Sequence, residues 1–576
     1  MKSEHRSRAV GHGDGPHLRP PRERVCDTVA AAGRRHGERV AVVCGTDRLT
    51  YRELLAAAGR ICRGLRKAAP GRIAVLGHRT VLTPAYLLAV HLSGRAFVLL
   101  DPNSPERLRR HVLTSTGVRL VLDPRTVPEP GGLDGPGADG DLADEAYVLH
   151  TSGSTGLPKG VSVTQRNLAS SNQARLTVYQ EFGTPCFLLL SPFFFDSSVA
   201  GTWGTLAAGG CLVIATEEER RDPTALTTLV ERHRVTHTLT VPSFHAAFLH
   251  AVDARPERAR SLRVAICAGE RLPQSVLRHH FATCPAVPLI NEYGPTECTV
   301  WSTYRKYHRP GPSTIGVPIP GTSIRLVDEN LGEVADGEAG QIAISGPGVA
   351  LGYVGDAAET RQKFVDREGA GRTYLTGDIG RWTAGGELEF LGRLDNQAKV
   401  RGVRINLDTV EQALGQYPGV QAAALAYDSE AALCHAFLVG KPHARLDEMD
   451  IRSTIEAAFG TSHVPDRLEF RDALPRTARD KVDRGALLNS VRTKRTVPAA
   501  RSESDLPVRI ARAWETVLGI PVQRHESVNF FDLGGNSISV LELSRVLAEI
   551  AGKPVPVGKV YRCGTIDQQV NLLRSL

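Results

Sequence analysis

A loop of hydroxyls, glycines and one lysine directly follows an apolar run. Residues 146–150 read Ala-Tyr-Val-Leu-His, and residues 151–160 continue as Thr-Ser-Gly-Ser-Thr-Gly-Leu-Pro-Lys-Gly. Glycines let the backbone approach an anion closely, while hydroxyls and a lysine can donate to phosphate oxygens. The pattern indicates a polyphosphate held at the end of a strand, with a flexible surface loop as the alternative. It is not a Walker A loop, because Gly-x-x-x-x-Gly-Lys-Ser/Thr cannot be laid over it. The predicted phosphate contacts are Thr151, Ser152, Gly153, Ser154, Thr155, Gly156 and Lys159.

The elements around this loop are typical of a layered α/β protein. Short β-rich runs such as residues 39–43 and 73–76 alternate with helical stretches such as residues 51–67. At ~150 residues per domain, a chain of 576 residues holds about three to five domains. The content of 41% hydrophobic and 23% charged residues is that of a soluble globular protein.

Composition disfavours several classes of function. The net charge of +8 comes from Lys and Arg spread along the whole chain, which indicates a solvated surface rather than a nucleic-acid site. The ten cysteines show neither a Cys-x-x-Cys pair nor a Cys/His cluster at metal-ligand spacing, so no disulfide framework or zinc site is predicted. Residues 1–24 lack the apolar core of a signal peptide, and no later run reaches ~18 apolar residues. We expect no nucleic-acid partner, no membrane association and a cytoplasmic location.

Five further motifs stand in a fixed order along the chain. They are Leu-Thr-Tyr-Arg-Glu-Leu at 49–54, Phe-Asp-Ser-Ser at 195–198, Asn-Glu-Tyr-Gly-Pro-Thr-Glu at 291–297, Tyr-Leu-Thr-Gly-Asp-Ile at 374–379 and Gly-Arg-Leu-Asp-Asn-Gln at 392–397. Together with the loop, and over roughly residues 25–490, they resemble the successive core motifs of nonribosomal peptide synthetase adenylation domains. That family of adenylate-forming enzymes joins a carboxylic acid to AMP and then to a thiol. The resemblance implies ATP and Mg²⁺ as cofactors.

The resemblance also assigns nucleotide contacts. It implies that Tyr293 stacks on adenine, that Asn291 reads the adenine edge and that Asp378 accepts from both ribose hydroxyls. An Asx-turn is the alternative role for Asp378. Further nucleotide contacts are implied at Gly294, Thr296, Phe390 and Arg393, and Phe390 stands where the family often has Tyr.

Glu297 is the implied metal ligand. Mg²⁺ favours hard oxygen ligands, neutralises phosphate charge and orients the leaving pyrophosphate. The alternative is a carboxylate that stabilises the start of a helix.

Lys481 is the implied catalytic residue. A lysine between the two reactants stabilises the negative charge that builds on the phosphoryl oxygens when a carboxylate attacks the α-phosphorus. The family pattern is Asn-Gly-Lys-x-Asp-Arg, whereas residues 479–484 read Arg-Asp-Lys-Val-Asp-Arg. This departure puts the loop geometry in question, and an ordinary solvated lysine is the alternative.

Asp395 and Lys399 mark the predicted hinge between a large and a small lobe. In the family the small lobe rotates about such an aspartate after adenylation, which withdraws the catalytic lysine and presents a thioester-forming face. A plain turn is the alternative.

Asp196 determines the predicted class of substrate. In isolation a carboxylate after Phe193-Phe194-Phe195 would be a helix N-cap. In amino-acid-activating members of the family this position binds the α-ammonium group, whereas fatty-acid and aryl-acid ligases have no cation there to pair. The sequence therefore favours an amino acid.

The motif order also predicts a substrate pocket. Its walls are small at Ala200 and Ala268, capped by Trp301, and polar at Ser197, Thr240 and Glu292. A buried Glu292 would need a donor or a cation, which a planar side chain with N–H or O–H could supply. The set most resembles histidine-activating pockets, with tyrosine as runner-up. The full set is Asp196, Ser197, Ala200, Thr240, Ile266, Ala268, Glu292, Val300, Trp301 and Lys481.

The last ~70 residues contain a second kind of site. Residues 529–539 read Asn-Phe-Phe-Asp-Leu-Gly-Gly-Asn-Ser-Ile-Ser and resemble the attachment motif of peptidyl carrier proteins, whose serine receives a 4′-phosphopantetheine arm. Ser537 stands at the start of a helix with periodic apolar residues. The alternative is a simple N-cap. The motif implies a phosphopantetheinyl transferase as a partner.

We therefore predict a two-lobed adenylate-forming α/β enzyme followed by a four-helix carrier domain. The expected division is a disordered tail over 1–24, an adenylation core over 25–394, a small α+β subdomain over 395–490, a linker over 491–505 and a carrier over 506–576. The enzyme would activate an amino acid with ATP and load it onto its own carrier for a downstream synthetase or tailoring enzyme. A small MbtH-like activator is a further candidate partner. An acyl-CoA ligase and a non-catalytic carrier scaffold are the rival functions.

Overall fold

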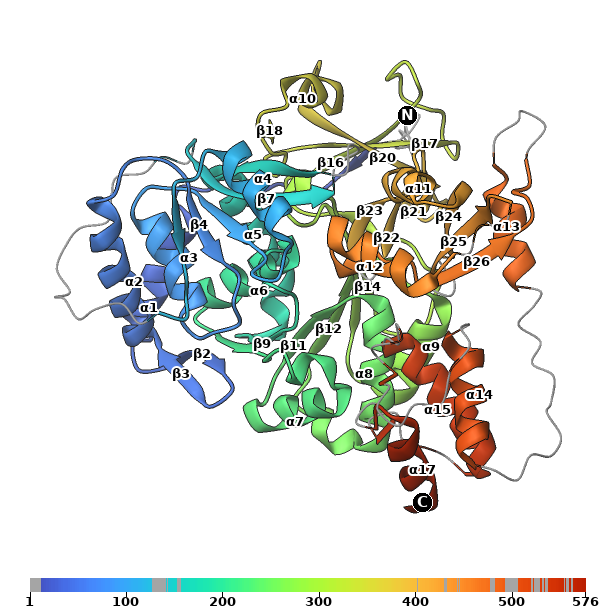
Figure 1. Cartoon of the computed structure of the whole chain (residues 1–576). Coiled ribbons are helices and arrows are strands. Elements are labelled where there is room, and N and C mark those ends of the chain that lie inside the picture. Colours follow the sequence, from blue (N-terminus) through green and yellow to red (C-terminus); the bar gives the residue numbers. More distant parts are fainter. Residues whose placement is uncertain are drawn as a thin grey trace, which may run out of the picture.

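The structure is a computed structural model, shown in Figure 1 with a large N-terminal core, a smaller lobe in orange and a helical unit in red. It describes residues 12–126, 141, 143–152, 157–400, 402–428, 433–442, 444, 446–476, 482–492, 506–518, 522, 529–530, 533, 537–553, 555, 559–560 and 563–575.

Two mainly parallel sheets form the centre of the core. The larger one runs in the order β15 (Val317–Pro318), β14 (Thr303–Tyr307), β13 (Leu289–Tyr293), β12 (Val264–Ala268), β11 (His237–Thr240), β9 (Cys186–Leu189), β10 (Cys211–Ile214), β2 (Val40–Cys44) and β3 (Asp47–Thr50). The second runs in the order β18 (Gly352–Tyr353), β8 (Pro158–Thr164), β7 (Glu145–Ser152), β5 (Phe97–Leu100), β4 (Ile73–Leu76) and β6 (Leu120–Leu122). The helices of the core are α1 (Val25–Arg35), α2 (Tyr51–Arg66), α3 (Thr83–Leu92), α4 (Glu106–Thr116), α5 (Gln165–Tyr179), α6 (Asp196–Ala207), α7 (Pro223–His233), α8 (Pro242–Ala254), α9 (Gln274–Thr283) and α10 (Ala357–Lys363).

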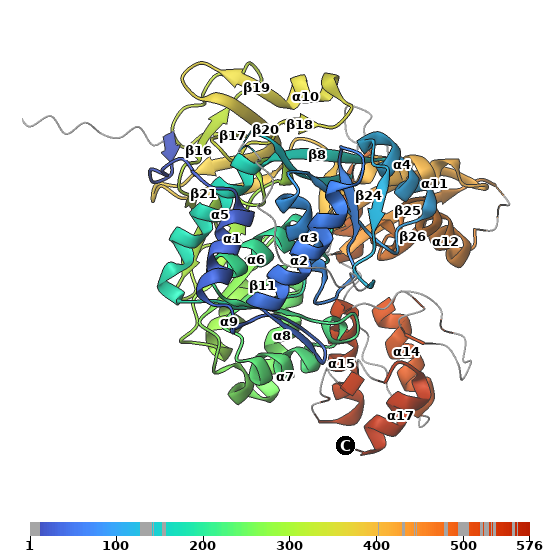
Figure 2. The ribbon, with the colours of Figure 1, turned by 90° about the vertical axis from the view of Figure 1, so that its left-hand side faces the viewer.

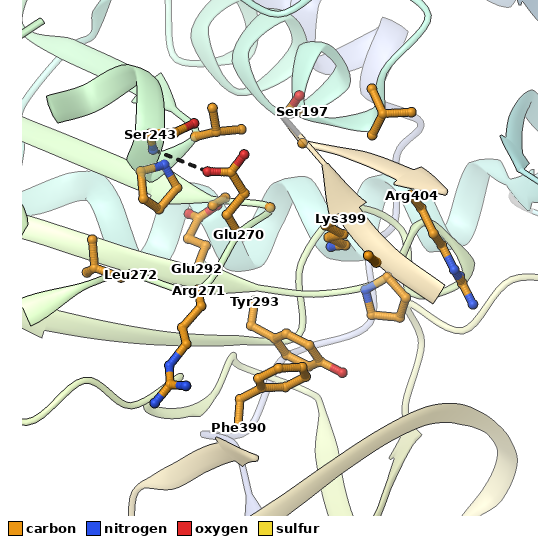
Figure 3. A pocket seen from close by; sticks show the side chains of 18 of the residues that line it. Ser197, Ser243, Glu270, Arg271, Leu272, Glu292, Tyr293, Phe390, Lys399 and Arg404 are labelled. Carbon is orange, nitrogen blue, oxygen red and sulfur yellow. Dashed lines mark hydrogen bonds between the residues drawn. The ribbon is translucent and has the colours of Figure 1, made fainter. Parts of the chain in front are cut away.

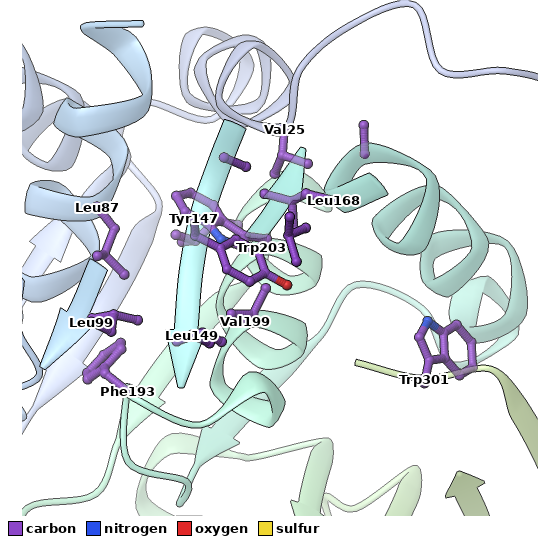
Figure 4. Packing of buried hydrophobic residues seen from close by; sticks show 14 of the residues in the cluster. Val25, Leu87, Leu99, Tyr147, Leu149, Leu168, Phe193, Val199, Trp203 and Trp301 are labelled. Atoms are coloured by element: carbon purple, nitrogen blue, oxygen red, sulfur yellow. The ribbon is translucent and has the colours of Figure 1, made fainter. Parts of the chain in front are cut away.

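A ladder of buried rings joins the two sheets. Trp203 of α6 stacks on His91 of α3 with 5.2 Å between ring centroids, and His91 stacks on Phe97 of β5 at 4.9 Å. Phe97 in turn stacks on Tyr147 of β7 at 5.6 Å. Figure 4 shows Tyr147 and Trp203 within this packing. The ladder fixes β7, which leads into the phosphate loop, relative to α6, which begins at Asp196.

The motif at residues 49–54 has a structural role. Thr50 caps the start of α2, and the Glu53 carboxylate accepts from the Thr50 backbone N–H at 2.8 Å, which makes a reciprocal capping box. The buried Tyr51 hydroxyl lies 3.0 Å from the carbonyl oxygen of Leu206 and 2.9 Å from that of Gly210. This motif therefore anchors α2 to the end of α6.

A third, antiparallel sheet corrects the prediction of a disordered tail. It runs in the order β1 (His12–Asp14), β16 (Ser323–Val327), β17 (Ala339–Ser345), β20 (Gly371–Trp382) and β19 (Phe364–Arg367), and β21 (Leu388–Arg393) also pairs with β20. The prediction is therefore wrong for residues 12–24, and residues 1–11 lie outside the described residues. Three residues are too few for a periodic signal, so β1 is ordered by its partner strand. A Cβ on Gly13 would lie 2.3 Å from the Trp382 ring, which shows how closely β1 packs.

The smaller lobe begins with a hairpin. Strands β22 (Gln397–Val400) and β23 (Val403–Asn406) form it, and Lys399 pairs with Arg404 across its ladder. Within the described residues, the sheet β24 (Val420–Asp428), β25 (Leu433–Gly440) and β26 (Arg467–Arg471) follows, with helices α11 (Leu407–Gln416), α12 (Glu448–Phe459) and α13 (Arg484–Arg492).

The C-terminal unit is helical and has its own apolar core. Its helices include α14 (Leu506–Leu518), α15 (Ser537–Ala551) and α17 (Ile566–Ser575). Ile510, Ala513 and Trp514 of α14 are buried at helical spacing, and the Trp514 indole N–H donates to Gln569 at 2.8 Å.

This helical unit touches both lobes. Helix α15 packs against α8 of the core, and Figures 1 and 2 both show the two helices side by side. The Arg467 guanidinium of β26 donates to the carbonyl oxygen of Val517 in α14. In the part of the chain that the structure describes, we find no helix that combines the length and apolar character of a membrane span.

Candidate active site

A cavity of about 950 Å³ lies between the core and the small lobe. Its floor is formed where the parallel strands β11, β12 and β13 end, which is the usual place for ligands in open α/β sheets. His150 and Thr151 at the end of β7 also line it, so this strand delivers the phosphate loop to the cavity. The small lobe contributes the hairpin of β22 and β23, and Figure 3 shows Lys399 and Arg404 on it.

Asp196 occupies the first turn of α6 and faces the cavity. Its Oδ2 accepts from the Thr296 hydroxyl at 2.6 Å. Burial raises the pKa of this carboxyl, while the Thr296 hydrogen bond and the Lys399 ammonium oppose the rise. Burial likewise lowers the pKa of Lys399, against the attraction of Asp196 and Asp378. A further cation close to Asp196 would therefore be favourable.

The predicted pocket is brought together only in part. The positions that line the cavity are Asp196, Ser197, Thr240, Ala268, Glu292 and Val300. Ala200, Ile266 and Trp301 are buried in the protein and do not line it. The prediction that Trp301 caps the pocket is wrong, because its ring lies over the Arg175 guanidinium, 4.4 Å from centroid to carbon.

Glu292 already has a cation. The Arg175 guanidinium of α5 donates to both carboxylate oxygens at 2.9 Å, and the Tyr179 hydroxyl donates to Oε1. All three side chains are buried. The expectation that Glu292 requires a donor or cation from the substrate is therefore wrong, since the protein supplies both.

The predicted adenine contacts lie together at the end of β13. The Asn291 amide N–H donates to the carbonyl oxygen of Thr314 at 2.8 Å, and Asn291 lines the cavity. Figure 3 shows the rings of Tyr293 and Phe390 beside each other, and their centroids lie 6.3 Å apart. Gly294 and Thr296 also line the cavity.

Arg393 links the predicted ribose anchor to the predicted hinge. Its guanidinium pairs with Asp378 and also with Asp395, the latter at 2.7 Å from Nε to Oδ1. The Tyr293 hydroxyl donates to the other oxygen of Asp378 at 2.5 Å. Burial raises the pKa of Asp395, but the hydrogen bonds and charge of Arg393 outweigh it and leave the pKa below its usual value.

Glu297, the predicted metal ligand, is buried in the short 3₁₀ turn η4 (Thr296–Cys298). The Arg404 Nη1 lies 3.0 Å from Oε1 and 3.3 Å from Oε2, and the Tyr353 hydroxyl donates to Oε1 at 2.8 Å. Burial raises the pKa of Glu297, yet Arg404 and the hydrogen bonds lower it below its ordinary value. Lys159, predicted to contact phosphate, pairs with Glu359 of α10.

Several predicted residues cannot be compared with the structure. Gly153, Ser154, Thr155, Gly156 and Lys481 lie outside the described residues. Ser152 ends β7 and Ser537 begins α15.

Sequence reasoning missed the partners of the site carboxylates. Arg175, Tyr179 and Arg404 lie in no motif from which a contact with Glu292 or Glu297 could be read. The signal available was general: a buried carboxylate requires a nearby cation or hydrogen-bond donors.

Comparison with known proteins places two families on the chain. The profile of AMP-binding enzymes matches residues 29–354, and that of the phosphopantetheine attachment site matches residues 508–573. One of the plipastatin synthases of Bacillus subtilis (strain 168) is 32% identical over 565 residues, which cover 93% of this chain and 15% of the synthase. Tyrocidine synthase 2 of Brevibacillus parabrevis is 32% identical over 539 residues, covering 88% of this chain and 15% of the synthase. The chain thus spans about a seventh of the length of either synthase.

A solved structure matches almost the whole chain. Holo-PA1221, a nonribosomal peptide synthetase protein containing adenylation and peptidyl carrier domains bound to a vinylsulfonamide inhibitor, has a TM-score of 0.77 and 28% sequence identity. The match covers 96% of each chain.

Proposed function

Because the chain belongs to the AMP-binding enzymes and also carries a phosphopantetheine attachment domain, we propose that it activates an amino acid as aminoacyl-AMP and loads it onto its own carrier. Asp196 is the observation that carries this proposal. It places a carboxylate, whose pKa burial has raised, at the wall of a cavity large enough for a nucleotide and an amino acid. The α-ammonium group of a substrate would relieve that cost.

In the first step, a carboxylate oxygen of the amino acid attacks the α-phosphorus of ATP and pyrophosphate leaves. No general base is required, because the nucleophile is already ionised. We assign Lys481 to the charge that develops on the phosphoryl oxygens, and Tyr293, Asn291 and Asp378 to the adenosine. Tyr293 and Arg393 each occupy one oxygen of Asp378, and each oxygen keeps a second lone pair that can accept from a ribose hydroxyl.

Glu297 would hold Mg²⁺. The residues fit a cation, because the buried carboxylate is held here by a guanidinium and one phenolic hydroxyl. Mg²⁺ prefers hard oxygen ligands such as this carboxylate. When bound, it would neutralise negative charge on the phosphates.

In the second step, the carrier thiol attacks the acyl carbonyl carbon, and AMP leaves as the thioester forms. The packing of α15 on α8 supports this step, since Ser537 is the first residue of α15 and the start of α8 lines the cavity. We assign Asp395 to the hinge that brings the β22–β23 hairpin, with Lys399, to the cavity.

For the substrate side chain, L-histidine is our first candidate and L-tyrosine the runner-up. The Arg175 pair changes the reason for this choice, because a compensated Glu292 does not require a cationic ligand. A neutral imidazole and a phenol both offer a single donor to the polar wall at Ser197 and Thr240.

An amino-acid-dependent pyrophosphate exchange assay over the twenty amino acids tests this proposal. We expect exchange with one amino acid or a small group, and no exchange with fatty or aryl acids. If the folded protein shows no exchange with any amino acid, also after addition of an MbtH-like activator, the scaffold function is favoured. Release of a soluble CoA thioester would favour the acyl-CoA ligase. A phosphopantetheinyl transferase and a downstream enzyme are the further partners that we propose.

A further inference from the structure

Glu297 is reached by a cation from the other lobe. Its own lobe supplies the Tyr353 hydroxyl, whereas the Arg404 guanidinium comes from β23, beyond Asp395 in the sequence. A single guanidinium nitrogen lies within 3.3 Å of both carboxylate oxygens. Mg²⁺ would also require oxygen lone pairs of this carboxylate, and two cations beside one buried carboxylate repel each other. Arg404 and Mg²⁺ therefore compete for Glu297.

The contact belongs to a chain of polar contacts that begins at the hinge. Arg393 pairs with Asp395 and donates to the Gln397 amide oxygen at 3.1 Å. Arg404 donates to the same oxygen at 2.5 Å and pairs with Glu297. A continuous series of polar side-chain contacts thus connects the hinge aspartate, the hairpin and Glu297.

Two further predicted nucleotide contacts have protein partners, in both cases within the core. Lys159 is paired with Glu359, and Asp378 with Arg393. A nucleotide would add to or replace these protein partners, since an ammonium has three donors and a carboxylate has about four acceptor sites. Of these three ion pairs, the Arg404–Glu297 pair alone depends on the position of the small lobe.

We propose that Arg404 replaces Mg²⁺ on Glu297 after adenylation, so that departure of Mg²⁺ and pyrophosphate permits the hairpin to take this position. The inference rests on the proposed function, in which Glu297 holds the metal. Arg404 is a positioning residue: it touches no reacting atom and acts by competing with the metal for Glu297. Rebinding of Mg²⁺·pyrophosphate would displace Arg404 from Glu297 and move the small lobe away from this position. The cation that is bound to Glu297 would thus determine whether the lobe is placed for adenylation or for thioester formation.

The test follows the lobe position by fluorescence energy transfer in the full chain. Genetically encoded labels are placed at Met449 of α12 and Val121 of β6, which are both exposed. We expect Mg²⁺·pyrophosphate to change the transfer efficiency of wild type, and pyrophosphate with EDTA to leave it unchanged. A wild-type efficiency that does not respond to Mg²⁺·pyrophosphate would overturn the inference without any variant.

Substitutions of Arg404 then test the contribution of its guanidinium group. In Arg404→Gln, we expect the change at about tenfold lower Mg²⁺·pyrophosphate, within the usual range of coupling between two ligands, and Arg404→Lys should lie between it and wild type. The matched control is Arg471→Gln, because Arg471 pairs with Glu469 inside the small lobe. An unchanged midpoint in Arg404→Gln would contradict the inference.

Two activities measured on the same samples separate the possible failures. Arg404→Gln should keep pyrophosphate exchange and slow transfer to the carrier, whereas a purely structural defect would lower both. Absence of exchange in wild type would count against the proposed function, while the fluorescence midpoint still reports on Arg404.

Discussion

Two buried carboxylates beside the cavity, Glu292 and Glu297, are both paired with arginine, but their arginines come from different bodies. Arg175 of α5 belongs to the same core as Glu292, and both side chains are almost fully buried. Arg404 of β23 belongs to the small lobe and lies across the lobe boundary from Glu297. The first pair can be a permanent part of the core, whereas the second exists only while the lobes hold this position.

The charge of Asp196 is compensated differently from that of Glu292 or Glu297. Its side chain accepts from the neutral Thr296 hydroxyl, and burial raises its pKa despite the charge of Lys399, whereas the pKa of Glu297 is lowered. Charge compensation thus differs by role. Glu292 is compensated within its lobe, Glu297 by the other lobe, and we assign the compensation of Asp196 to the substrate.

We expect the greatest loss of stability when the pair between Arg175 and Glu292 is broken. Arg175→Met should lower the free energy of unfolding of the core by about 3–5 kcal/mol, because Glu292 is left buried without a cation. Denaturant unfolding followed by the fluorescence of the core tryptophans measures this loss. The control is Arg52→Met, whose partner Glu38 is exposed, and there the loss should stay below about 1 kcal/mol. Equal losses in the two variants would remove the distinction between a core pair and a surface pair.

The second prediction concerns the binding of the amino acid by Asp196. Asp196→Asn should raise the amino-acid KM of pyrophosphate exchange, by a factor that corresponds to about 1.5–3 kcal/mol for a hydrogen bond to a charged group. The KM for ATP should stay nearly constant. A rise shared equally by both substrates would show that Asp196 supports the fold of the site rather than the α-ammonium group.

The third effect concerns the pair between lobes. Arg404→Gln should lower the thermal stability of the core less than Arg175→Met does, by about 1 kcal/mol or less, because rotation of the small lobe lets Glu297 reach water or Mg²⁺. Differential scanning calorimetry with and without Mg²⁺·ATP is the measurement. A loss as large as that of Arg175→Met would mean that the two pairs are equally permanent.

The smallest effect is expected when the permanent pair is removed as a whole. Arg175→Met combined with Glu292→Met should return the free energy of unfolding to nearly the wild-type value, since apolar side chains of similar volume leave no uncompensated charge. The unfolding assay of the single variant applies. Failure to recover would place the loss in the packing of Arg175 against Trp301 and not in its charge.

The sequence was sufficient to predict the fold class and much of the cavity wall, because those residues stand in contiguous motifs. Asp196, Asn291 and Tyr293 all line the cavity. The partners of the carboxylates could not be predicted, since Arg175 lies 117 residues before Glu292 and Arg404 lies 107 residues after Glu297. Such pairs depend on the packing of β13, α5 and β23 in three dimensions, and a short sequence motif does not predict this packing.

Two errors have different causes, one local and one long-range. The alignment of the motifs with the family's pocket positions predicts both Val300 and Trp301 in the pocket, but Val300 lines the cavity while Trp301 turns into the core over Arg175. The backbone of Val300 adopts a φ of 85°, an unusual conformation for a β-branched residue, and this local geometry is not predictable from the motif. The strand β1 was missed because its order comes from pairing with β16.

In the proposed function, one chain both activates an amino acid and receives it. Intact-protein mass spectrometry of the phosphopantetheine-bearing protein, incubated with Mg²⁺·ATP and each amino acid in turn, tests it most directly. We expect one amino acid, or a small group, to add the mass of an aminoacyl group to wild type and to add nothing to Ser537→Ala. A protein that exchanges pyrophosphate but never gains this mass, or a Ser537→Ala variant that gains it, would contradict the claim.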